Sequence, residues 1–118
     1  SDPSAFAEPQ IRIVNGKRIG IFSIEAYTTS TLLARYLAFF EENDADVVMC
    51  LTPRAKYLED CEGVDVVVVT TDYPYEDVST RGETRGQTLV VRSPEVGEVG
   101  VVLLTTNNVP SARVITGS

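Results

Sequence analysis

The sequence contains no histidine, and it has only two cysteines, Cys50 and Cys61. Without histidine, a serine or cysteine nucleophile lacks its usual general base, so nucleophilic catalysis of the triad type is disfavoured. The cysteines form no C-x-x-C motif, which argues against a metal knuckle. We expect them to lie at opposite ends of neighbouring parallel strands, too far apart for a disulfide.

Basic residues and long apolar runs are also scarce. Ten Lys and Arg face 17 Asp and Glu, which gives a formal net charge of −7. Nucleic-acid binding requires clustered basic side chains, so we expect no nucleic-acid partner. No run approaches the roughly 20 apolar residues of a membrane helix, so we expect no membrane insertion. The start of the sequence shows no basic region followed by an apolar stretch, the pattern of a signal peptide.

The remaining composition is that of an ordinary globular domain, with 43% hydrophobic and 23% charged residues in 118. This length allows one hydrophobic core. Residues 1–10, which include Pro3 and Pro9, indicate an extended lead-in. We expect residues 11–118 to form a single α/β domain.

Local patterns predict the elements of the first half. Asn15-Gly16 lies between two apolar runs, 11–14 and 18–24, and both residues tolerate the positive φ of a type I′ turn. This pattern predicts a β-hairpin. From Ser30 to Asn43, apolar residues recur every three or four positions, which predicts an amphipathic helix. Thr28, Thr29 and Ser30 offer the N-cap oxygen.

A strand, a short helix and a second strand are predicted next. Residues 46–51 and 64–70 are the strands, and Thr52-Pro53 is typical of a helix start, with threonine as N-cap. The run 66–69 is apolar on both faces, as in a central parallel strand. A polar loop at 72–87 leads to strands at 88–92, 97–105 and 111–116. Together these elements predict a mixed β-sheet flanked by helices on one face.

Several of these stretches also share motifs with a known family. The residues that carry the likeness lie at 15–22, 45–52, 63–73, 87–92 and 98–104. In this order they resemble n-G-x-k-v-G-i-i-G, a-D-v-v-i-x-l-S-H, g-i-D-v-i-i-g-G-H-x-H and the two closing strands of the calcineurin-like metallophosphoesterases, in particular their 5′-nucleotidase branch. The resemblance implies half of an αββα sandwich, in which two sheets pack face to face. The metal motifs of the family's first half have no counterpart here.

The resemblance also implies that the metal ligands of this half are lost. Thr52, Thr71 and Tyr73 stand where the family has histidines. Zinc, manganese and iron sites of this kind require imidazole nitrogen and carboxylate oxygen, which hydroxyl groups do not replace near neutral pH. We therefore expect no metal cofactor and no catalytic residue. Family members of this kind suggest a periplasmic or secreted location.

One loop offers lower-ranked candidates for a ligand site. Asp72, Glu76 and Asp77 could hold a hard cation such as calcium. Arg81 and Arg85, beside two glycines, could grip a phosphate or carboxylate. A solvated acidic loop and a surface turn with Arg–Glu pairs are the simpler interpretations of these patterns.

Two functional hypotheses follow. The first is a non-catalytic, 5′-nucleotidase-like domain that acts as a structural or interaction module. The second is part of a metal-dependent phosphoesterase whose active site is completed by a missing N-terminal segment or a partner chain. A third, a small-molecule binding module that uses the loop at 72–86, has less support. A half sandwich exposes an apolar sheet face, which soluble monomers rarely tolerate, so we expect a homodimer or a missing domain half to cover it.

Overall fold

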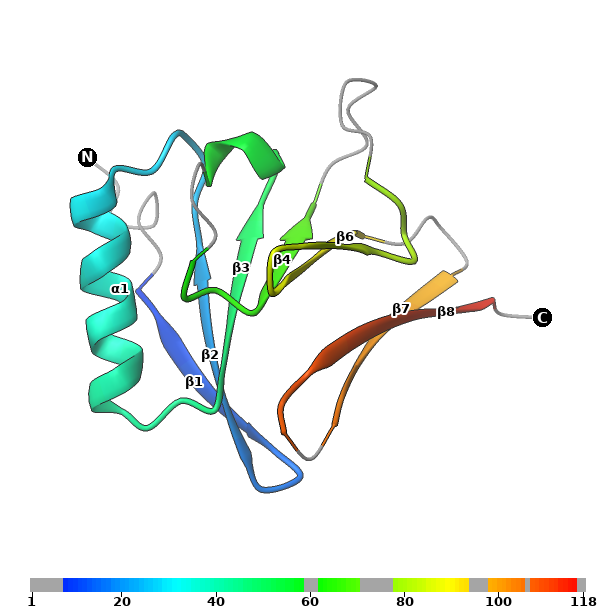
Figure 1. Ribbon diagram of the computed structural model, residues 1–118, viewed down its shortest axis with the longest axis horizontal. Helices are drawn as coiled ribbons and strands as arrows, with labels where there is room; N and C mark the ends of the chain where they lie inside the picture. The colour runs from blue at the N-terminus through cyan, green and yellow to red at the C-terminus, as the bar shows by residue number, and fades with distance from the viewer. Residues whose placement is uncertain (1–7, 59–61, 71–77, 94–97, 106, 117–118) are drawn as a thin grey trace.

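The computed structural model describes residues 8–58, 62–70, 78–93, 98–105 and 107–116. Three layers are visible: a helix, a central sheet and a β-hairpin on the opposite side of the sheet (Figure 1). In chain order the elements are β1 (Gln10–Val14), β2 (Lys17–Ser23), α1 (Ser30–Glu42), β3 (Val47–Thr52), the 3-10 helix η2 (Ala55–Tyr57), β4 (Val66–Val69), β5 (Glu83–Arg85), β6 (Thr88–Arg92), β7 (Glu98–Leu104) and β8 (Pro110–Thr116).

The central sheet has six strands in the order β1-β2-β3-β4-β6-β5. The four middle strands run parallel, whereas β1 and β5 pair antiparallel at the two edges. Strand β4 lies between β3 and β6 and consists of four valines, three of them buried. This confirms the predicted mixed α/β sheet and the central position of residues 66–69.

The hairpin predicted at Asn15-Gly16 is present. Asn15 and Gly16 adopt φ values of 51° and 80°, and Val14 pairs with Lys17 on either side of the turn. Because both turn residues have positive φ, the geometry is that of a type I′ turn, whose twist matches the flanking strands. Strand β1 begins at Gln10, one residue before the predicted apolar run.

Helix α1 covers one face of the sheet. Thr29 is the N-cap, and its side chain accepts a hydrogen bond from the Leu32 amide. The predicted apolar stripe is buried through Leu33, Tyr36 and Phe40. The Phe22 ring of β2 stacks on Tyr36, with centroids 4.7 Å apart, and lies 5.8 Å from the Phe40 ring. This aromatic contact joins the helix to the sheet.

Two aspartates act in the same way at the starts of parallel strands. The Asp46 amide donates to Arg18 O while the Asp46 carboxylate accepts from the Arg18 amide, both at 2.8 Å. Asp65 repeats this exchange with Val48 one strand further on, at 2.9 and 2.8 Å. The aspartate that precedes each strand therefore binds the backbone of the neighbouring strand and fixes the register of the two.

We expect Asp65→Ala to lower the free energy of unfolding by about 1.5–3 kcal/mol, because it leaves the Val48 amide without its charged acceptor. Asp65→Asn keeps an acceptor oxygen and should cost less than half as much. The equivalent bond of Asp46 is exposed, so Asp46→Ala should also cost less. Urea unfolding of the three variants measures these differences. Equal losses for Asp65→Ala and Asp65→Asn would contradict the role assigned to the carboxylate.

Two sequence predictions were wrong in this region. Thr52 does not cap a helix: it is the last residue of β3, and the short helical turn that follows is a three-residue 3-10 helix whose N-cap is Arg54. The Thr52 hydroxyl instead donates to Arg54 O at 3.0 Å. The predicted polar loop also contains a strand, β5. It forms a hairpin with β6 through a two-residue turn that includes Gly86.

The hairpin β7–β8 forms a second, two-stranded sheet on the face opposite α1 (Figure 1). Val102, Leu104 and Ala112 pack against a second core cluster made of Ile19, Val47, Val66 and Val91. The chain thus covers part of the face that was predicted to be bare. Within the described residues, no helix has both the length and the apolar character required to cross a membrane.

Candidate functional site

The C-terminal edge of the sheet is where the family resemblance places the lost metal ligands. Thr52 lies there, with only 1% of its surface exposed. Its Oγ1 donates to Arg54 O, and the Arg54 amide approaches the same oxygen at 3.4 Å. The hydroxyl is therefore engaged in a local turn, and its chemistry does not fit a site that requires imidazole.

The other acidic and lost-ligand candidates cannot be placed. Thr71, Asp72, Tyr73, Glu76 and Asp77 lie outside the described residues. In the part of the chain that is described, no three His, Cys, Asp or Glu side chains gather as a metal site requires. Cys50 is a fully buried thiol in β3, and Cys61 lies outside the described residues, so the expected absence of a disulfide between them stays a prediction.

The two candidate arginines are both exposed. Arg85 lies in β5 and forms an ion pair with Glu83, with 3.1 Å between Nη2 and Oε1 and nearly half of each side chain exposed. The Arg81 amide donates to the Ser79 hydroxyl in the preceding turn. Gly82, at φ 79°, packs so closely that a Cβ would lie 2.8 Å from Leu89. This glycine therefore has a packing role, and the neighbouring glutamate already partners one of the two cations.

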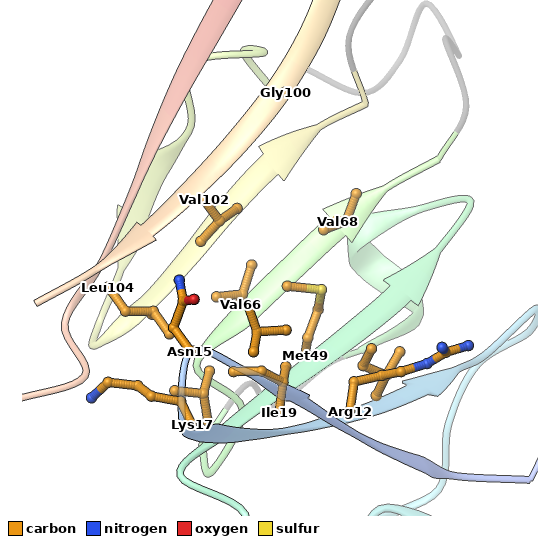
Figure 2. Close-up of a pocket in the computed structure, with 13 residues that line it drawn as sticks. Arg12, Asn15, Lys17, Ile19, Met49, Val66, Val68, Gly100, Val102 and Leu104 are labelled. Atoms are coloured by element: carbon orange, nitrogen blue, oxygen red, sulfur yellow. The ribbon is translucent and has the colours of Figure 1, made fainter.

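A hollow lies between the central sheet and the β7–β8 hairpin (Figure 2). We call it the sheet groove, and its volume is about 700 Å³. It is lined by Arg12, Val14, Asn15, Lys17, Ile19, Ile21, Val47, Met49, Val66, Val68, Gly100, Val102 and Leu104. Val47 and Val66 are buried beneath the hairpin, whereas Ile21, Met49 and Val68 remain partly exposed. The floor of the groove is therefore apolar and only partly covered.

The polar side chains of the groove come from the β1–β2 hairpin. Arg12 pairs across the strands with Ile19, so it projects from the groove face of the sheet (Figure 2). Lys17 Nζ donates to Asn108 Oδ1 in the β7–β8 turn, which joins the tips of the two hairpins. Among the described residues that line the groove, none is acidic. A chain with net charge −7 thus presents two cations beside its exposed apolar surface.

On the opposite face of the sheet, the apolar stripe of α1 is packed against the strands. Tyr36 and Phe40 are only 9% and 1% exposed because they pack on the sheet. Strands β4 and β7 contribute to the groove through Val66, Val68 and Val102.

Comparison with known proteins supports the fold assigned from the motifs. Neither a family model nor a curated protein matches the chain. Solved structures that share its fold include a Staphylococcus aureus protein assigned as a 5′-nucleotidase and solved with α-ketoglutarate, with a TM-score of 0.58 and 12% identity over 92% of this chain. The NAD nucleotidase of Haemophilus influenzae has a TM-score of 0.62 and 12% identity over 89% of this chain.

The chain therefore has a 5′-nucleotidase-like fold, as the resemblance predicted. It spans only 29% of the length of each of these two proteins. The groove itself was not identified from the sequence. The available signals were the alternation of Lys17, Ile19 and Ile21 along β2 and the charged Arg12 on the edge strand β1, but charged residues on an edge strand usually indicate a solvated edge.

Proposed function

We propose that this chain is a non-catalytic, nucleotidase-like domain that acts as a structural or interaction module, and that the sheet groove is its contact surface. The partly exposed floor formed by Ile21, Met49 and Val68 carries this proposal. Contiguous apolar surface of this kind is typical of binding sites in soluble proteins. A covering layer from outside this chain would bury it.

The chemistry of the sequence supports the absence of catalysis. The chain has no histidine, and the one lost-ligand position that the structure describes, Thr52, uses its hydroxyl in a backbone turn. In this proposal the active site of the nucleotidase-like fold is degenerate. The half-sandwich has kept the strands and the aspartates that fix their register, which are structural features, and has lost the metal donors.

A second candidate function has one observation in its favour. Because the chain matches only 29% of each nucleotidase, it could be one part of a hydrolase whose metal ligands come from a missing N-terminal segment or a partner chain. The histidines of this half would still be lacking. We therefore rank this function second.

We expect the purified chain to bind no stoichiometric zinc, manganese or iron and to hydrolyse neither nucleoside monophosphates nor p-nitrophenyl phosphate. The reason is the lack of imidazole donors in the sequence. Elemental analysis and a phosphate-release assay test this, with an active 5′-nucleotidase as the positive control. Near-stoichiometric metal together with turnover that a chelator abolishes would overturn the proposal and favour the hydrolase.

A further inference from the structure

The second sheet is much narrower than the sheet that it covers. It contains two strands, β7 and β8, over a sheet of six. Strand β8 lies toward β6, where Ala112 packs near Val91, and β7 borders the groove through Gly100, Val102 and Leu104. The groove is therefore the space beside β7 in which the second sheet would continue.

The outer edge of β7, which faces away from β8, presents backbone N–H and C=O groups in a pattern suited to pairing with a further strand. Next to the turn, the Thr105 amide donates to Val109 O at 3.1 Å, which marks this pair as hydrogen-bonded. Hydrogen-bonded and non-hydrogen-bonded pairs alternate along an antiparallel ladder, so Leu104–Pro110 and Val102–Ala112 are non-bonded pairs. Pro110 fits this assignment because proline has no amide to donate.

The same alternation directs the N–H and C=O groups of Gly100, Val102 and Leu104 away from β8. These are the three β7 residues that line the groove. The stretch 100–104 has no charge and no proline, although natural edge strands are usually protected by such residues. By contrast, β8 carries Pro110 and Arg113.

From these observations we infer that the groove accepts an extended peptide strand from another polypeptide, which pairs with the outer edge of β7. Neighbouring strands lie about 4.8 Å apart and packed sheets about 10 Å apart, so such a strand would lie above Ile21, Met49 and Val68. Every second side chain would face this floor and should be apolar. A carboxylate on the strand would complement the positive charge of Arg12, which lines the groove from β1.

This inference rests on the proposed function and specifies its partner as an extended peptide. Strand addition of this kind takes affinity from main-chain hydrogen bonds and specificity from alternate side chains. A second copy of the chain and an apolar small molecule are competing occupants. The experiment below separates them.

The probe is a nine-residue peptide, acetylated and amidated, in which valine alternates with threonine and the last two residues are glutamates. We would titrate it into the 15N-labelled full chain and follow amide hydrogen exchange by NMR. We expect exchange at Gly100, Val102 and Leu104 to slow by about tenfold or more, with little change at Val101 and Leu103, whose amides already face β8. A scrambled peptide with its valines adjacent should have no such effect.

Two variants test the contacts. Val102→Pro removes an amide that does not bond to β8, so it should abolish peptide binding while the chain stays folded. Val102→Thr keeps the amide and is the matched control. Arg12→Gln should weaken binding by roughly 3- to 10-fold at low salt, an effect that should fade as salt screens the charge.

No binding at 1 mM peptide, or binding without protection of the three amides, would overturn the strand proposal. So would occupation of the groove by dodecanoate in place of the peptide, or by a second copy that saturating peptide does not displace. In the last case the chain would still be an interaction module. Metal-dependent turnover, by contrast, would refute the proposed function itself.

Discussion

Phe40→Ala is expected to lower the free energy of unfolding by about 3–5 kcal/mol. The Phe40 ring is 1% exposed and contacts Phe22 and Phe39, so its removal leaves a cavity at the centre of the interface between α1 and the sheet. Domains of this size are stable by only about 5–15 kcal/mol, so the loss would be a large part of the total. Phe39→Ala, on the same helix but only partly buried, is the matched control and should cost less.

A second variant tests the same contact from the sheet. A Cβ at Gly20 would lie 2.5 Å from Phe40 Cδ1, so Gly20→Ala should cost about 1–3 kcal/mol through overpacking. Gly20→Ala combined with Phe40→Leu should be more stable than the sum of the two single changes predicts. Chemical denaturation of the four proteins gives the coupling energy. Additive losses would show that the two residues do not meet as described.

The second large effect concerns association. With no other polypeptide present, a second copy can cover the groove, so we expect the isolated chain to dimerise and Met49→Glu to abolish the dimer. Met49 is partly exposed on the groove floor, and burying a charged carboxylate in the dimer interface has a desolvation cost. Ala38→Glu changes the charge equally on the exposed side of α1 and should leave the dimer intact.

Sedimentation velocity of the two variants measures the change, and thermal unfolding shows whether each remains folded. If Ala38→Glu and Met49→Glu sediment alike, the groove is not the dimer surface. Saturating peptide should also dissociate the dimer, because the peptide and the second copy occupy the same groove. Dissociation by Met49→Glu alone would locate the dimer interface at the groove.

Much of the fold could be predicted because it depends on local patterns. The Asn15-Gly16 turn requires positive φ, the helix stripe has a clear period, and the valines of β4 are apolar on both faces. The short helix after Thr52 was predicted from a cap pattern, but the chain turns there through a 3-10 helix because Thr52 completes β3 and pairs with Val69.

The features that sequence alone missed depend on contacts between distant residues. Strand β5 consists of three exposed residues that pair with β6, so it has no apolar pattern of its own. The position of the β7–β8 hairpin over the opposite face required knowledge of which face α1 covers. The family motif contained Asp46 and Asp65, but their bonds to neighbouring strands were visible only once the strand order was known.

The same reason limits prediction of the groove. Arg12, Met49 and Val102 lie on three separate elements and become neighbours only when the two sheets pack. The candidates that the sequence did single out near Asp72 lie outside the described residues, and Arg85 is paired with Glu83. Residue types alone indicated that imidazole donors are absent from the sequence. The sheet groove became visible only from the packing of the two sheets.

The most direct test of the interaction-module proposal is the mass of the unaltered chain, measured by light scattering during size exclusion at micromolar concentration. The monomer has a mass of 12.9 kDa. We predict about twice this value, because a second copy covers the groove when no partner strand is present. A clean monomer across the concentration range would contradict the expected dimer and, with it, the groove as a surface for self-association.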